Sequence, residues 1–171
     1  KLADRGELES DVALVALRVP PQSSRNRLLR ELGFDSDEPV HLTRIHYYEE
    51  MDRAAAGVLR SMDRQGFRDT AIRKMKIALA ELLVNALEHG NRKDPAKRVV
   101  IGYTADANRV KVSVMDEGDG FNPSLIPDPT LEGNVIKDRG RGLFLARHFV
   151  DKVQFNAKGN RVTAVKYFHP G

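Results

Sequence analysis

A polar face on an otherwise apolar helix is the first feature of this sequence that could do chemistry. The segment ELLVNALEHG begins at Glu81 and puts Asn85 four residues later, so both share one helix face, with His89 one turn further. A carboxylate there can act as a general base, and a carboxamide oxygen can ligate Mg²⁺. Alternatively, both groups are exposed or satisfied structurally, and His89 interacts with the helix C-terminus.

A second motif, DEGDG, occupies residues 116–120 directly after a segment with strand character. The carboxylate of Asp116, at the end of that strand, can accept a hydrogen bond from an exocyclic amine. Gly118 and Gly120 would let a flat group approach the backbone closely. An ordinary Asp/Gly turn is the alternative explanation of the same residues.

A third motif, DRGRGL, stands at residues 138–143, immediately before a short predicted helix. Gly140 and Gly142 permit close approach to the backbone, and the amides of a helix N-terminus attract an anion. Arg139 and Arg141 can add charge-assisted hydrogen bonds to a phosphate. The alternative is a flexible hinge with solvated arginines. The spacing matches neither a P-loop nor a dinucleotide-binding fingerprint.

Composition limits the classes of protein that could carry these motifs. The chain has 171 residues, of which 41% are apolar and 30% charged. This predicts one folded domain with an appended arm and excludes a collagen-like or largely disordered chain. The absence of cysteine excludes a disulfide framework, a thiolate zinc site and a cysteine nucleophile.

Charge and hydropathy restrict the partners. The net charge is only +4, which does not demand nucleic acid, and no apolar run could span a bilayer. We therefore expect no direct nucleic-acid or membrane partner, and the absence of cysteine makes a cytoplasmic location our expectation. Residues 133–171 carry eight basic side chains against two acidic ones, which indicates an anionic ligand near this third of the chain or a solvated basic face.

Periodicity and turn signals predict the elements that must position the motifs. Residues 11–19 form a short buried strand, and residues 20–40 a linker with one helix at 25–32, so we expect a domain boundary near residue 40. After it the patterns predict, in order, strand 41–48, helix 49–65, a second helix that is capped by Asp69 or Thr70 and closed by Gly90, strands 98–105 and 109–115, helix 142–151, and strands 152–157 and 161–168. Residues 117–140 form a long loop, which is either a functional lid or disordered. This order predicts an α+β two-layer sandwich, with helices on one face of a mostly antiparallel sheet.

In this order the three motifs resemble those of the GHKL, or Bergerat-fold, ATP-binding superfamily of histidine-kinase-like ATPases. Residues 81–90 resemble its N box, residues 116–120 its first glycine box, and residues 139–143 its second. The resemblance covers about residues 41–168, some three quarters of the chain. It implies the Bergerat fold, with a mixed, mostly antiparallel sheet, and the cofactors ATP and Mg²⁺.

The resemblance also implies a role for individual residues. Glu81 matches the catalytic base, Asn85 the Mg²⁺ ligand, and Asp116 the carboxylate that recognises the adenine amino group. Gly118 and Gly120 would shape the base pocket. The residues that match the phosphate-binding end of the lid are Arg139, Gly140, Arg141, Gly142 and Leu143. Thr163 stands where the last box places a hydroxyl near adenine, although residues 159–163 depart from the usual Gly-Thr pair.

Within the superfamily, the chain is similar to the anti-sigma factor serine kinases of the RsbW and SpoIIAB type. It shows no helical hairpin bearing a phospho-accepting histidine, as a histidine kinase would, and no transducer domain. The resemblance implies a serine/threonine protein kinase that acts in transcription regulation by partner switching. Its partners would be a sigma factor and a STAS-type anti-anti-sigma protein, and it would form a homodimer.

The N-terminal arm carries a further resemblance. Residues 9–18 resemble the terminal strand of SpoIIE-type phosphatases. This implies that residues 1–40 are the stub of an upstream phosphatase domain and residues 41–171 the ATP-binding kinase domain. Two alternatives to the kinase remain: a catalytically silent ATP-sensing binding module, and the ATP-binding domain of a larger signalling protein.

Overall fold

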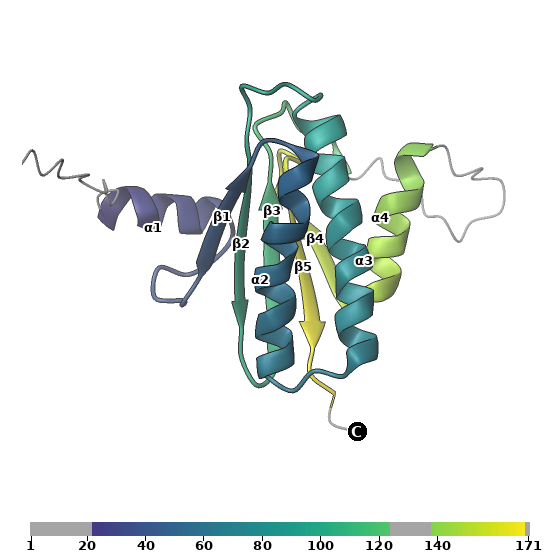
Figure 1. The fold of residues 1–171 in the computed structure, drawn as a ribbon. Helices are drawn as coiled ribbons and strands as arrows, with labels where there is room; N and C mark the ends of the chain where they lie inside the picture. The colour runs from purple at the N-terminus through teal and green to yellow at the C-terminus, as the bar shows by residue number, and fades with distance from the viewer. Residues whose placement is uncertain (1–21, 124–137, 170–171) are drawn as a thin grey trace, which may run out of the picture.

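The computed structural model describes residues 22–123 and 138–169 (Figure 1). In chain order the elements are α1 (Gln22–Glu31), β1 (His41–Ile45), the 3₁₀ turn η1 (Tyr48–Glu50), α2 (Met51–Arg64), α3 (Asp69–Asn85), the π-helical turn η2 (Ala86–Gly90), β2 (Val99–Ala105), β3 (Arg109–Met115), α4 (Asp138–Phe149), β4 (Lys152–Phe155) and β5 (Arg161–Tyr167). The strand predicted at residues 11–19, the phosphatase-like segment and most of the predicted long loop lie outside the described residues.

The strands form one sheet in the order β1-β2-β3-β5-β4, and all four pairings are antiparallel. The predicted hairpin of β2 and β3 is confirmed. Its turn is closed by the Asp106 carboxylate, which accepts hydrogen bonds from the N–H groups of Asn108 (2.7 Å) and Arg109 (3.0 Å). The second hairpin joins the sheet through β5, which pairs with β3. This order brings the end of β3 beside the β4–β5 turn.

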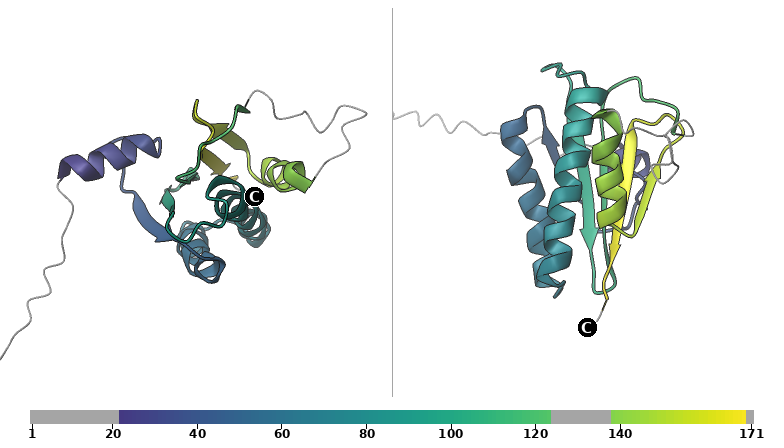
Figure 2. Two further views of the ribbon diagram at one scale, coloured as in Figure 1. Left: turned by 90° about the horizontal axis from the view of Figure 1, so that it is seen from above. Right: turned by 90° about the vertical axis from the view of Figure 1, so that its right-hand side faces the viewer.

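Helices α2, α3 and α4 lie side by side on one face of the sheet and enclose the main core (Figure 2). Apolar residues recur every three or four positions along the helices and at every second position along the strands, as a two-layer core requires. The α2 and α3 residues that are buried in this core are Ala54, Val58, Met62, Met75, Ala78, Leu79, Leu82 and Leu83, and β3 adds Val110, Val112 and Val114. The predicted α+β sandwich is therefore confirmed.

Helix α1 lies on the opposite face of the sheet (Figure 2). There it forms a second apolar cluster, in which Val100 of β2 is buried together with Leu29, Leu32, Phe34 and Val40. Gly102 fits under this cluster, because a Cβ on it would lie 3.1 Å from both Leu32 and Phe34. Residues 22–40 thus contact the sheet directly. The domain boundary near residue 40 stays a prediction.

Several boundaries differ from the predicted ones for local reasons. Strand β1 ends at Ile45 because the N–H groups of His46 and Tyr47 donate to the Glu50 carboxylate, at 2.7 and 3.2 Å, and not to a neighbouring strand. The residue before α3 is Arg68, which makes no side-chain cap, so neither Asp69 nor Thr70 is the N-cap.

In the described part of the chain, no helix has the length and apolar character to cross a membrane.

Helix α4 begins at Asp138, four residues before the predicted start at Gly142. Glycine costs a helix about 1 kcal/mol relative to alanine, so the two glycines of this segment lowered its predicted helicity. The helix packs along α3, and tertiary packing of this kind outweighs intrinsic propensity.

Candidate functional site

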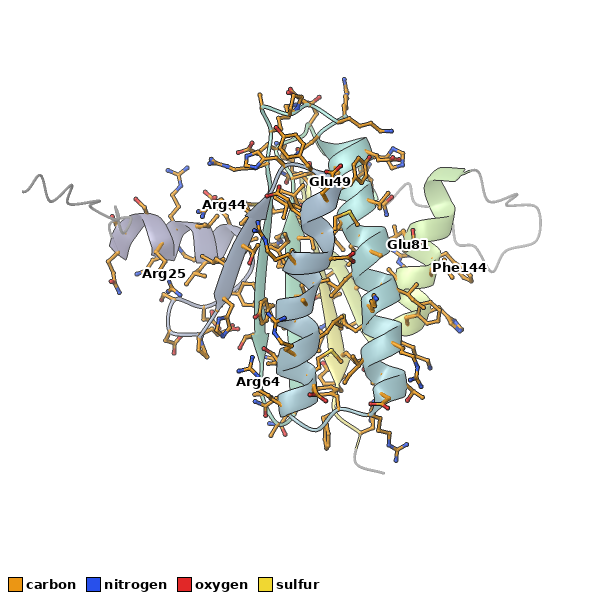
Figure 3. All side chains as sticks on the ribbon, viewed as in Figure 1. Arg25, Arg44, Glu49, Arg64, Glu81 and Phe144 are labelled. Atoms are coloured by element: carbon orange, nitrogen blue, oxygen red, sulfur yellow. The ribbon has the colours of Figure 1, made fainter. Side chains whose placement is uncertain are left out.

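The polar face predicted on the 81–90 helix is present in α3. Glu81 and Asn85 are half-buried, and Glu81 projects on the side of α3 where α4 lies (Figure 3). His89, one turn further, is exposed. Beyond Asn85 the helix changes to the π-helical turn η2, a feature that is frequent at functional sites.

Gly142 brings α4 into direct contact with this polar face. A Cβ built on Gly142 would overlap the Glu81 carboxylate and lie 3.4 Å from Asn85 Nδ2. A side chain at residue 142 would therefore displace the end of the Glu81 side chain. The structure thus brings together the predicted base, the predicted metal ligand and the second glycine motif.

The other residues of that motif are placed only in part. Arg139, Gly140 and Arg141 belong to the beginning of α4, and the side chains of the two arginines lie outside the described part of the structure. Leu143 is half-buried and packs against the main core. Phe144 projects from α4 on the side away from α3 (Figure 3).

Asp116 follows β3 and meets the end of the 81–90 segment. A Cβ on Gly90 would overlap the Asp116 carboxylate, and a Cβ on Gly118 would overlap the Gly90 carbonyl. The Gly118 N–H donates to Asp116 Oδ1 at 2.8 Å. Burial raises the pKa of Asp116, although the Gly118 N–H and the charge of Lys158 act in the opposite direction. The result is a half-buried carboxylate beside bare glycine backbone.

Gly120 has a different function from Gly118. It adopts φ +78°, and a Cβ on it would overlap the Lys158 carbonyl. Gly159 in turn has φ +75° and lies against the Phe121 carbonyl. The Phe121 N–H donates to Lys158 O at 3.1 Å. Gly120 therefore joins the segment after Asp116 to the β4–β5 turn.

Thr163 does not lie beside Asp116 and the glycines that contact it. Its neighbours in β5, Val162 and Ala164, belong to the core on the helix side of the sheet, so strand alternation turns Thr163 to the other face. There its hydroxyl lies 3.2 Å from that of Ser113, and both residues are buried. Asp116 lies on the helix side, against Gly90.

Asn91 is a buried residue of this region that the sequence patterns did not indicate. Its side chain is 1% exposed, and its Oδ1 accepts a hydrogen bond from the Glu117 N–H at 2.9 Å. Its Nδ2 has no hydrogen-bond partner among the described residues. The Glu117 carboxylate is also held, by the N–H and the Nε of Arg98, both at 3.0 Å. An asparagine directly after a helix-ending glycine looks like a turn residue, so only its burial marks it.

No group of three or more acidic or histidine side chains that could hold a metal occurs within residues 22–123 and 138–169. A single carboxamide such as that of Asn85 suits Mg²⁺, which usually keeps several waters and binds through one or two protein ligands and substrate phosphates. The donor set therefore fits a metal that arrives with a phosphate ligand, not one held by the protein alone.

Comparison with known proteins gives the class to which this fold and site belong. Residues 47–166 match the family model described as the histidine kinase-like ATPase domain. The match covers more than half of the chain, so the chain belongs to this family. The predicted resemblance to histidine-kinase-like ATPases is confirmed.

Within the family, the chain is similar to proteins named serine-protein kinase RsbW and to one named anti-sigma F factor. It is 31% identical to the serine-protein kinase RsbW of Bacillus subtilis over 113 residues, which are 62% of this chain and 71% of that protein. It is 27% identical to the anti-sigma F factor of Anoxybacillus flavithermus over 100 residues, 54% of this chain and 65% of that protein. The crystal structure of the RsbU and RsbW domains of a Mycobacterium tuberculosis protein covers 77% of this chain and 34% of that one, at 18% identity and a TM-score of 0.46.

Proposed function

We propose that this chain is an ATP-dependent serine/threonine protein kinase and anti-sigma factor. It phosphorylates a STAS-type anti-anti-sigma protein and binds a sigma factor. The observation that carries the proposal is the approach of Gly142 in α4 to Glu81 and Asn85. This approach groups a carboxylate, a carboxamide and a glycine-containing helix start at one position. The names of the relatives supply the class of acceptor.

Mg²⁺ and ATP fit the residues that are present. The half-buried Asp116 carboxylate is an acceptor for the adenine amino group, and it lies directly against the backbone of Gly90. Asn85 supplies a hard oxygen for Mg²⁺. The first turn of α4, which includes Arg139 and Gly140, supplies backbone N–H groups for the phosphates.

The catalytic demands of phosphoryl transfer are mainly positioning and charge neutralisation. When bound, Mg-ATP supplies the phosphoryl group. Glu81 accepts the proton of the acceptor hydroxyl, and its carboxylate lies against Gly142 of α4. Arg139 and Arg141 neutralise phosphate charge. The predicted lid, residues 122–139, lies largely outside the described residues.

A transfer assay tests the proposal. The protein is mixed with γ-labelled Mg-ATP and an anti-anti-sigma protein from the same genome. We expect acid-stable label on the acceptor with the wild type and with the Glu49→Ala control, an exposed residue of η1. We expect no label with Glu81→Ala, although this variant still binds Mg-ATP. Equal loss of binding and transfer would contradict the role of Glu81 as base.

The other outcomes separate the alternatives. Mg-dependent ATP binding without any transfer would favour the ATP-sensing binding module. Acid-labile phosphate on histidine, or ATP turnover without a protein acceptor, would favour the ATP-binding domain of a larger signalling protein.

The proposal also covers the domain organisation of the chain, its cellular location and its oligomeric state. Residues 41–171 form the kinase unit, residues 1–40 are an arm that belongs to an upstream phosphatase domain, and the chain acts in the cytoplasm as a homodimer. Sedimentation of the purified chain tests the homodimer, because a single species of monomer mass at high concentration would exclude it.

A further inference from the structure

Two asparagines of the β4–β5 turn connect that turn to Asp116. Asn160 Nδ2 donates to the backbone carbonyl of Asp116 at 2.9 Å, and the Asp116 N–H donates to the backbone carbonyl of Asn160 at 3.0 Å. Both backbone groups of Asp116 are therefore bonded to one residue, 44 positions away in the sequence. The backbone of Asp116 is therefore fixed to the β4–β5 turn.

Asn156 fixes the orientation of the Asn160 side chain. Asn156 Nδ2 donates to Asn160 Oδ1 at 2.9 Å, which leaves Asn160 Nδ2 facing the Asp116 carbonyl. Asn156 Oδ1 accepts from the N–H groups of Gly159 (2.9 Å) and Arg161 (3.1 Å). Every amide in this chain of bonds meets a group of the opposite kind, so a flip of either amide would oppose like groups.

The segment after Asp116 is held from the other side as well. Asn91 accepts the Glu117 N–H, and Arg98 bonds the Glu117 carboxylate. Asp116 thus lies between two fixed points, one at the end of η2 and one in the β4–β5 turn. Its carboxylate direction depends on both.

We propose that Asn160, oriented by Asn156, is a positioning residue that sets the direction of the Asp116 carboxylate toward the nucleobase. This inference rests on the proposed nucleotide-dependent function. Asn160 acts through the backbone of Asp116, so its loss affects recognition of the base and leaves recognition of the phosphates unchanged. The consequence is a change in selectivity between bases, which a general loss of stability would not produce.

Binding of two nucleotides and a phosphate probe by the full chain tests this inference. The nucleotides are ATP and ITP, which lacks the exocyclic amine, and the probe is Mg-tripolyphosphate. Asn160→Asp places an acceptor against the Asp116 carbonyl. We expect it to weaken ATP binding at least about tenfold and to reduce the ATP-to-ITP affinity ratio at least about threefold, since a lost or opposed hydrogen bond has effects of this order. Affinity for tripolyphosphate stays within about twofold.

Two further variants complete the design. Asn156→Asp keeps the acceptor for Gly159 and Arg161 but loses the donor to Asn160, so it should change the ratio in the same direction by a smaller factor. Asn108→Asp makes the same change in the exposed β2–β3 turn and should leave all three affinities unchanged.

An unchanged ATP-to-ITP ratio in both test variants would overturn the positioning role. A wild-type chain that binds ATP and ITP equally would contradict the assignment of Asp116 itself. A wild-type chain that binds neither nucleotide would overturn the proposed function together with the inference. If Asn160→Asp does not fold, Asn156→Asp decides the question alone.

Discussion

Gly142 of α4 lies so close to the Glu81 carboxylate of α3 that a Cβ on residue 142 would overlap this carboxylate unless the Glu81 side chain moved. The two residues are 61 positions apart in the sequence, and each comes from a motif with an ordinary structural explanation of its own. Their contact joins the two motifs into one group. It also connects the position of α4 to the position of the candidate base.

Gly142→Ala tests this contact through phosphoryl transfer and stability. The added Cβ overlaps only the end of the flexible, half-buried Glu81 side chain, which can turn away at little cost. Because alanine is more favourable than glycine within a helix by about 1 kcal/mol, we expect no loss of stability in urea unfolding. We expect phosphoryl transfer to fall, since the displaced carboxylate is the candidate base. Arg147→Ala, an exposed position of α4, is the control and should change neither. Unchanged transfer by Gly142→Ala would contradict the importance of this contact.

The raised pKa of Asp116 predicts a pH dependence of base recognition. Burial makes this carboxyl take up a proton at a higher pH than an ordinary aspartate, and the protonated form is a poorer acceptor for the adenine amine. We expect the ATP-to-ITP affinity ratio to fall as the pH is lowered through that raised pKa. Because both nucleotides carry the same phosphates, the titration of the phosphates cancels in this ratio.

In the Asp116→Asn variant, the ATP-to-ITP affinity ratio should be small and independent of pH. A ratio that does not change with pH in the wild type would contradict the assignment of Asp116.

The same shift has a consequence for the stability of the protein without nucleotide. A carboxyl whose folded pKa is raised binds its proton more tightly in the folded state than in the unfolded state. The contribution of this carboxyl to the stability of the folded protein is present at a pH below its unfolded pKa, and it is lost as the pH rises through its folded pKa. We therefore expect Asp116→Asn to unfold at a higher temperature than the wild type at neutral pH. A calorimetric scan measures this, and a lower unfolding temperature would contradict the expectation.

Arg161 connects α1 to the sheet through its Nη1, which donates to the last carbonyl of the helix, Glu31 O, at 2.7 Å. A cation at a helix C-terminus is also favoured by the helix dipole. We expect Arg161→Met, which keeps an apolar stem, to destabilise the protein by about 1–2 kcal/mol. It should also speed proteolytic cleavage within residues 22–40. Arg27→Met, which removes an exposed ion pair within α1, is the matched control and should have little effect. Equal cleavage rates in the two variants would argue against the connection.

Leu32→Ala tests whether residues 22–40 fold together with the sheet. Leu32 is fully buried in the second apolar cluster, so its truncation should cost about 2–5 kcal/mol. If the segment and the sheet form one cooperative unit, the whole unfolding transition shifts while remaining single. Leu28→Ala, at a half-buried position of α1, should cost less. An unshifted main transition would favour the predicted boundary near residue 40.

The sequence by itself determined most of the elements and indicated the candidate residues of the site. Apolar periodicity is a local property, so it predicted the order from β1 to β5 and both hairpins. Glu81, Asn85, Asp116 and the glycines were identifiable because their residue types are unusual for the helix, strand and loop where they occur. Boundaries were less predictable, because the Glu50 carboxylate and the packing of α4 decided them.

Only the tertiary structure decided which of these residues meet. Strand alternation turned Thr163 away from Asp116, and the order of the sheet placed the β4–β5 turn, with Asn160, against the end of β3. Gly90 and Asn91 gained their significance from contacts with Asp116 and Glu117, about 26 residues away. Contacts between such distant segments depend on how the strands pair and how the helices pack, and no local pattern in the chain encodes them.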